Sequence, residues 1–228
     1  MTNRANSNNQ TPEQRLRIKF AKGEALKYIS HLDLAKTWER VFRRAGLPLA
    51  YSQGFNPRPR FQIASALPVS VAGCAELMDV WLAEPLLPED VLSRLQPMLP
   101  AGLEVLGAEE VGLRSPSLQS QMRVADYRAV VSSCEPSEAI ATRVQSLLEA
   151  ATLLRQRHHK GRLKTYDLRP LIRTVRVEPG GDGEHILYMR LQASPQGAGR
   201  PDEVLDALGL SAVPHIMERT ELHFEFDK

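Results

Sequence analysis

The residues best suited to acid–base chemistry stand at the start of one predicted helix. His31 and Asp33 follow Ser30, a residue type that favours the N-cap position, where free N–H groups and the positive end of the helix dipole are found. A histidine in this place is a candidate general base, and Asp33 is near enough in sequence to orient it. The alternative is structural: Asp33 caps the helix and His31 makes a local hydrogen bond.

Cations and one aromatic residue nearby form a pattern typical of RNA-binding surfaces. On the predicted helix 30–45, Lys36 and three arginines follow the spacing i, i+4, i+7 and i+8, on a different face from Trp38. The loop 53–60 then brings an aromatic ring among arginines. Unpaired bases stack on such rings while phosphates pair with guanidinium groups. The predicted RNA contacts here are Arg40, Arg43, Arg44, Phe55, Asn56, Arg58 and Arg60. The alternative for the helix is a solvated outer face.

A second basic segment covers residues 154–176. It holds eight Lys/Arg and one acidic residue, Asp167. Clustered cations with little acid favour a phosphate backbone, and Arg200 opens the last predicted helix after a glycine, where a plain turn is the alternative. The predicted RNA contacts in this half are Lys160, Arg162, Lys164, Arg169 and Arg200. Asp167 is either a catalytic carboxylate or an ion-pair partner of Arg169 or Lys164. His158 and His159 lack a spaced third ligand, so we predict no metal site.

Two runs of strands and helices must position these residues. In the first half, we predict strands at 16–20, 47–51, 61–71, 76–83 and 103–111, and helices at 30–45 and 88–96. In the second half, we predict strands at 127–131, 174–177, 186–191 and 221–226, and helices at 136–150 and 201–208. The simplest description is an α+β fold of two tandem ferredoxin-like (βαββαβ) units. The expected parts are a disordered tail (1–14), a first unit (15–111), a linker (112–122) and a second unit (123–228).

Basic and acidic blocks alternate along the chain, although its net charge is only +2. Residues 15–60 carry 11 Lys/Arg and 3 Asp/Glu, a balance of +8, and residues 61–111 carry 1 and 8, a balance of −7. Residues 154–176 have a balance of +7 and residues 177–228 one of −6. This alternation indicates separate basic and acidic faces. With no apolar run near the ~20 residues of a membrane span and no apolar leader, we expect a cytoplasmic protein that does not enter membranes.

Several motifs resemble those of the radical-SAM-linked protein family. They are the segments 28–34 (YISHLDL), 54–59 (GFNPRP), 64–68, 164–170 (KTYDLRP) and 199–205 (GRPDEVL). That family is a domain of unknown function, fused to or encoded beside a cobalamin-binding radical SAM protein and often near ribonuclease and ribosomal-protein genes. The resemblance implies that protein as a partner, and an RNA context. Cys74 and Cys134 are too few for a metal cluster, so we expect no cofactor in this chain and assign radical chemistry to the partner.

Three functions follow as hypotheses. The first is an RNA-binding accessory module that presents an RNA substrate to a partner radical SAM enzyme. The second is an enzyme that cleaves or modifies RNA with His31, Asp33 and Asp167, prompted by the similar tandem fold of CRISPR repeat-RNA endonucleases. The third is a protein-docking subunit that uses its acidic faces and binds no RNA.

Overall fold

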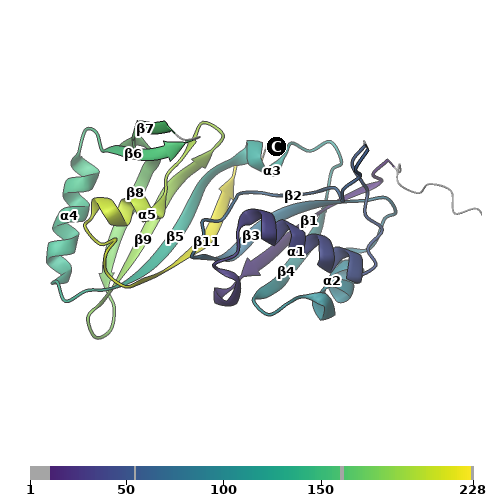
Figure 1. Cartoon of the computed structure of the whole chain (residues 1–228), viewed down its shortest axis with the longest axis horizontal. Coiled ribbons are helices and arrows are strands. Elements are labelled where there is room, and N and C mark those ends of the chain that lie inside the picture. Colours follow the sequence, from purple (N-terminus) through teal and green to yellow (C-terminus); the bar gives the residue numbers. More distant parts are fainter. Residues whose placement is uncertain (1–10, 54, 160–161, 227–228) are drawn as a thin grey trace, which may run out of the picture. The chain divides into compact units, whose positions relative to one another are not determined.

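Helices and strands of the chain fall into two units in this computed structural model. Unit 1 ends at Ser120 and unit 2 begins at Gln121, and the elements of each are labelled in Figure 1. The structure describes residues 11–53, 55–159 and 162–226. Within these ranges, no helix has the length and apolar character needed to cross a bilayer.

Unit 1 is a four-stranded antiparallel sheet with two helices. Its elements are β1 (Gln14–Lys22), α1 (His31–Arg44), β2 (Phe61–Ile63), β3 (Val71–Leu82), α2 (Pro88–Leu95) and β4 (Leu103–Val111), with 3₁₀ turns at Glu24–Leu26 and Gln96–Met98. The strand order is β2-β3-β1-β4. Helix α1 connects β1 to β2, and α2 connects β3 to β4, so the sequence-distant strands β1 and β3 lie side by side at the centre.

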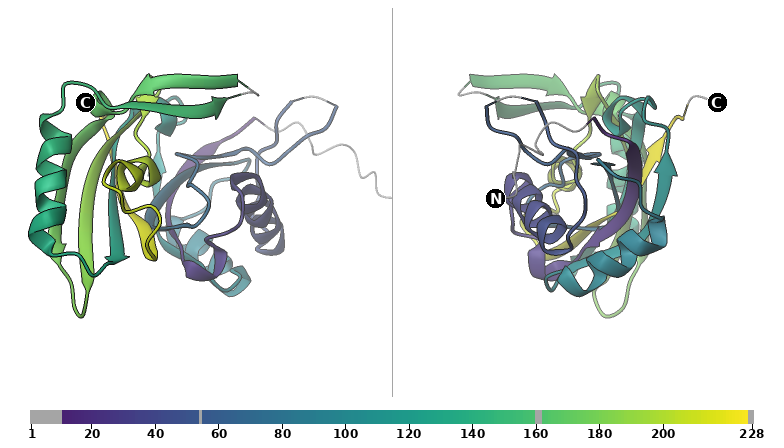
Figure 2. Two further views of the ribbon diagram at one scale, coloured as in Figure 1. Left: turned by 60° about the vertical axis from the view of Figure 1, so that its left-hand side comes forward. Right: turned by 90° about the vertical axis from the view of Figure 1, so that its right-hand side faces the viewer.

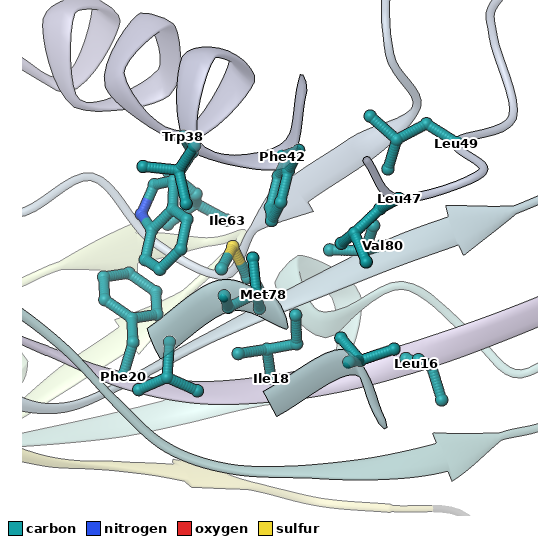
Figure 3. Close-up of a cluster of buried hydrophobic side chains, with 14 of the residues drawn as sticks. Leu16, Ile18, Phe20, Trp38, Phe42, Leu47, Leu49, Ile63, Met78 and Val80 are labelled. Atoms are coloured by element: carbon teal, nitrogen blue, oxygen red, sulfur yellow. The ribbon is translucent and has the colours of Figure 1, made fainter. Parts of the chain in front are cut away.

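The core of unit 1 lies between one face of this sheet and both helices. Trp38 of α1 is fully buried, with its ring 5.1 Å from that of Phe20 and 5.4 Å from that of Phe42 (Figure 3). The predicted apolar face of α1 is therefore confirmed. Alternate residues of the central strands complete the cluster, which includes Leu16 and Ile18 of β1, Met78, Val80 and Leu82 of β3, Val91 and Leu95 of α2, and Leu103 and Val105 of β4. Burial of each large apolar side chain contributes about 1.5–3 kcal/mol.

Two predicted strands of unit 1 are wrong. Residues 47–51 make only isolated bridges, Leu49 with Leu82 and Tyr51 with Pro59. The strand predicted at 61–71 ends at Ile63, and β3 begins at Val71, five residues earlier than expected. Pro68 has no N–H to donate to a ladder, and Ser70 has φ +72°. The chain therefore turns between β2 and β3.

Unit 2 contains the remaining strands and helices of the chain. Its elements are β5 (Met122–Ser132), α4 (Ser137–Glu149), β6 (Leu154–His159), β7 (Arg162–Asp167), β8 (Ile172–Pro179), β9 (Glu184–Ser194), β10 (Gly197–Ala198), α5 (Pro201–Ala207) and β11 (His215–Phe224), with a 3₁₀ turn at Arg169–Leu171. The short helix α3 (Leu118–Gln121) spans the boundary between the two units. The strand order is β8-β9-β5-β11, all antiparallel, and β10 also pairs with β9.

The hairpin of β6 and β7 is a two-stranded sheet of its own (Figure 2). It carries the second basic segment and is inserted between α4 and β8. Helix α4 runs along β8 in the same view, and its buried residues Ile140, Val144 and Leu147 face the core. Residues 180–183 form the turn of the β8–β9 hairpin, with Gly183 at φ +80°. Strand β11 begins six residues before its predicted start.

Candidate nucleic-acid interface

The N-terminus of α1 is capped by the residues that the sequence suggested for chemistry. The Ser30 hydroxyl accepts a hydrogen bond from the Asp33 N–H (3.2 Å) and donates one to the Asp33 carboxylate (2.7 Å). The hydrogen bond from Ser30, followed by the bond and charge of Lys36, lowers the pKa of Asp33 below its usual 3.8. His31 Nδ1 is buried without a hydrogen-bond partner in the described part of the chain. This geometry favours the capping role of Asp33 over orientation of His31.

The outer face of α1 is basic and open to solvent. Lys36 is exposed and makes a 3.4 Å ion pair with Asp33. The arginines Arg40, Arg43 and Arg44 are exposed too, and no described carboxylate lies within 4.0 Å of their guanidinium nitrogens. Arg43 and Arg44 also lie in the last turn, where a cation complements the helix dipole. Three unpaired cations therefore line one side of this helix.

An aromatic side chain projects from the loop that follows. Residues 52–58 form what we call the Phe55 loop, of which Gly54 lies outside the described residues. The loop is closed at its base, where the Ser52 N–H donates to the Arg58 carbonyl (2.9 Å) and the Arg58 N–H donates to the Ser52 hydroxyl (3.1 Å). Phe55 is 106% exposed, and Asn56 and Arg58 are exposed as well. The loop therefore exposes both the Phe55 ring and the Arg58 guanidinium group to solvent.

Arg60 lies apart from these residues, on the opposite face of the sheet. Trp81 alternates with the core residues Val80 and Leu82, so its side chain points away from α1. The Arg60 guanidinium lies 4.7 Å from the centroid of the Trp81 ring. Both line a pocket of about 410 Å³, which we call the Trp81 pocket. The sequence placed Arg58 and Arg60 on one surface, and the structure separates them.

Below this pocket is a buried charge cluster that sequence reasoning missed. Asp79 is fully buried and accepts hydrogen bonds from Arg15 Nε (3.2 Å), Arg15 Nη2, Arg17 Nε (3.0 Å) and Arg17 Nη2 (3.3 Å). Arg15 also donates to the carbonyls of Ser115 and Pro116, which ties the predicted linker to the sheet. Strand β1 is thus buried on both faces here. The available signal was Asp79 itself, an acid in an apolar run.

The basic hairpin of unit 2 is partly neutralised by α5. Lys160 lies outside the described residues, as does the side chain of Arg162, while Lys164 is exposed. The Tyr166 hydroxyl bonds to the Glu203 carboxylate, and Arg155 lies 3.7 Å from Asp206. Burial, followed by the hydrogen bond to Glu203, raises the pKa of Tyr166. Acidic residues of α5 therefore anchor the hairpin.

Three further predicted site residues have structural partners instead. Asp167 accepts hydrogen bonds from the backbone N–H groups of Leu153 (2.7 Å) and Arg169 (3.0 Å), rather than an ion pair. The Arg169 guanidinium donates to the carbonyl of Leu148 at the end of α4 (2.6 and 3.0 Å) and to that of Ile172 (3.2 Å). Arg200 makes a bidentate pair with Asp202 (3.1 and 2.6 Å). These bonds give Asp167, Arg169 and Arg200 structural partners, and their part in RNA binding or chemistry stays a prediction.

The open face of the unit 2 sheet holds a second ion-pair cluster. The Asp126 carboxylate of β5 accepts hydrogen bonds from Arg190 Nε (2.7 Å) and Nη2 (2.6 Å) and lies 2.8 Å from His223 Nε2. Asp126 also lines a pocket of about 300 Å³. Burial alone would raise the pKa of Asp126, but the hydrogen bonds from Arg190 and His223 hold it below 3.8. Glu221 completes a group of ligand atoms within 4.8 Å of one another, yet any cation there would compete with Arg190. This cluster depends on the pairing of β5 with β9.

Comparison with solved structures shows one chain with a similar fold. A chain of the crystal structure of a Cbf5-Nop10-Gar1 complex matches with a TM-score of 0.50 and 12% identity, over 93% of this chain and 50% of that chain. A chain of the structure of an H/ACA RNP bound to a substrate RNA containing 2'-deoxyuridine matches with a TM-score of 0.47 and 11% identity, over 95% of this chain and 53% of that chain. This chain spans about half the length of those it matches.

Sequence comparison shows the family. None of the curated proteins compared with this chain matches it. A family model matches residues 15–201, which cover unit 1 from Arg15 onward and unit 2 as far as Pro201. The motifs between Tyr28 and Pro170 lie within this range, and the segment 199–205 begins in it. The chain therefore belongs to the family described as "Uncharacterized protein conserved in bacteria (DUF2344)".

Proposed function

We propose that this chain is an RNA-binding module that contacts unpaired RNA with the outer face of α1 and with the Phe55 loop. The observation that carries the proposal is Phe55, a fully exposed ring on a loop whose base is hydrogen-bonded. Exposure of a phenyl ring to water is unfavourable, and a stacked base would cover it. Such stacking contributes about 1–3 kcal/mol per base.

The charges of α1 and the loop match a phosphate backbone. Arg40, Arg43, Arg44 and Arg58 are exposed, and no described carboxylate lies within 4.0 Å of any of them. Each cation that neutralises a phosphate of a single strand contributes about −0.7 to the slope of log affinity against log salt concentration. Four such contacts predict a slope of about −3.

We also infer that both units are ferredoxin-like. In each, the order of the four main strands is β4-β1-β3-β2 when they are numbered within the unit, with a helix after the first and after the third strand. The β6–β7 hairpin is then an insertion in the second unit.

The binding test uses a fluorescein-labelled 12-nucleotide single-stranded RNA, titrated with the whole chain at several salt concentrations. We expect Phe55→Ala to weaken binding by about 5- to 150-fold, from the loss of one stacked base. The triple variant Arg40→Ala/Arg43→Ala/Arg44→Ala should reduce the salt slope by about 2. Arg94→Ala, which removes an exposed arginine of α2, is the matched control and should bind like the parent. Absence of binding at low salt, or equal losses in the control, would refute the proposal.

For the partner, we propose a cobalamin-binding radical SAM protein, to which this chain presents its RNA. This part rests on the resemblance in sequence. Co-purification of the two proteins, with and without ribonuclease treatment, is the test. The docking-subunit hypothesis would be favoured if the complex persists after ribonuclease treatment and the isolated chain does not bind RNA. The enzymatic hypothesis is disfavoured because Asp33 and Asp167 are committed to capping bonds.

A further inference from the structure

The Trp81 pocket lies on the face of the unit 1 sheet opposite α1 and α2. It has a volume of about 410 Å³, within the range of small-molecule sites. Among the described residues no carboxylate belongs to its lining, which consists of Arg15, Arg60, Phe61, Gln62, Trp81, Leu113, Ser115 and Ser117. A pocket with two guanidinium groups and no acid on its surface favours an anion.

The floor of the pocket is held rigidly. Arg15 packs 4.9 Å from the Trp81 ring centroid on one side, while its Nε and both Nη atoms are hydrogen-bonded to Asp79 and to the carbonyls of Ser115 and Pro116. These bonds also fix the segment that carries Ser115 and Ser117. The pocket is therefore organised before any ligand binds, which reduces the ordering cost of binding.

Arg60 is the positively charged side chain of this pocket that remains available to bind a ligand. It is exposed, and throughout the described ranges no carboxylate oxygen lies within 4.0 Å of its guanidinium nitrogens. Its position 4.7 Å from the Trp81 ring centroid is a cation–π contact, which leaves N–H donors free for an anion such as phosphate. The hydroxyls of Ser115 and Ser117 are further donors in the same pocket.

The rest of the lining suits a heterocyclic base. Leu113 is apolar and 44% exposed, so it offers an uncovered surface to the face of a base. Gln62, directly opposite Asp79 in the β2–β3 ladder, has an amide that both donates and accepts hydrogen bonds. An amide of this kind pairs with the edge of an unpaired base.

We propose that the Trp81 pocket binds a nucleotide, with its phosphate on Arg60 and its base against Leu113 and Gln62. The nucleotide is either free or one residue of an RNA strand. This inference goes beyond the proposed function, because neither α1 nor the Phe55 loop takes part in it.

The test is a titration of the whole chain with uridine 5′-monophosphate and adenosine 5′-monophosphate, followed by tryptophan fluorescence. The chain has two tryptophans, and Trp38 is buried in the core, so a change reports on Trp81. We expect Arg60→Ala to weaken binding by at least about tenfold. Arg94→Ala, which removes an exposed arginine of α2, should bind like the parent. Uridine without phosphate should bind at least about tenfold more weakly than its monophosphate.

Two arms distinguish the outcomes. A uridine trinucleotide that binds more tightly than the monophosphate assigns the site to an RNA strand, and equal affinities assign it to free nucleotides; both support the pocket. Inorganic phosphate that binds as tightly as the monophosphates would overturn the nucleotide assignment, as would a lack of response at about 10 mM nucleotide. Nucleotide binding that persists in the Arg40→Ala/Arg43→Ala/Arg44→Ala variant, with RNA binding lost in it, separates this site from the α1 surface.

Discussion

Removal of the Asp79 carboxylate should destabilise unit 1 strongly. Asp79 is fully buried, and its partners Arg15 and Arg17 are 2% and 7% exposed. In Asp79→Ala, both guanidinium groups lose the buried carboxylate that they share. Loss of one partner of a buried ion pair costs about 3–5 kcal/mol, and we expect the free energy of unfolding to fall by this amount.

Urea denaturation followed by tryptophan fluorescence measures this loss. Both tryptophans of the chain, Trp38 and Trp81, belong to unit 1, so the signal reports on the unit that carries Asp79. Glu84→Gln is the matched control, since Glu84 is exposed in the same unit, and it should change stability by less than about 0.5 kcal/mol.

A rescue variant separates the loss of charge balance from the loss of volume. Replacement of Arg15, Arg17 and Asp79 together by Met, Met and Leu removes the buried charges while filling similar space, so it should cost less than Asp79→Ala alone. A cost below about 1 kcal/mol for Asp79→Ala, or a rescue variant less stable than Asp79→Ala, would refute this account of the cluster.

Two further predictions concern unit 2. The pKa of Asp126 is lowered in the folded state, so its ion pair contributes stability that is complete above the unfolded value of 3.8 and is lost as the pH falls through the lower folded value. Thermal unfolding between about pH 5 and 2 should therefore show a steeper loss for the parent than for Arg190→Met, and equal slopes would contradict the assignment. Arg169→Ala removes three hydrogen bonds to the carbonyls of Leu148 and Ile172 and should cost about 1.5–3 kcal/mol. The measurement is amide hydrogen exchange at the end of α4, with Arg173→Ala as the exposed control, and unchanged protection would rule this role out.

Features encoded by near neighbours in the chain could be predicted from the sequence. Helix α1 follows from the Ser30 cap, from apolar residues spaced three and four apart, and from Gly46, which has φ +62° just beyond the helix. The exposed loop of Phe55 follows from its prolines and turn residues. These features require only local hydrogen bonds and one buried face, so the short-range pattern determines them.

Strand ends and roles of charged residues were less predictable. The strand predicted at 61–71 has the composition of a strand, but the backbone at Ser70 turns the chain away from the ladder. Asp167 and Arg169 lie in a basic segment that suggested phosphate contacts, yet they bond to backbone groups exposed at the end of α4 and the start of the hairpin. A charged side chain near a helix end forms hydrogen bonds with the unpaired polar groups closest to it in space. The amino-acid composition of a segment carries no information about those distances.

The clusters around Asp79 and Asp126 exist only because of tertiary structure. Residues 17 and 79, like residues 126 and 190, are more than sixty positions apart and meet because the antiparallel ladders β1–β3 and β5–β9 place them directly opposite each other. A shift of one residue in either register would move each pair to opposite faces of the sheet. By itself, the sequence determined where the longer helices lie, which face of α1 is apolar and where cations concentrate. The register of strands distant in sequence decided which cations pair with a buried carboxylate and which, like Arg60, remain available to a ligand. The physical reason is that only folding brings a carboxylate distant in sequence within ion-pair distance of a cation.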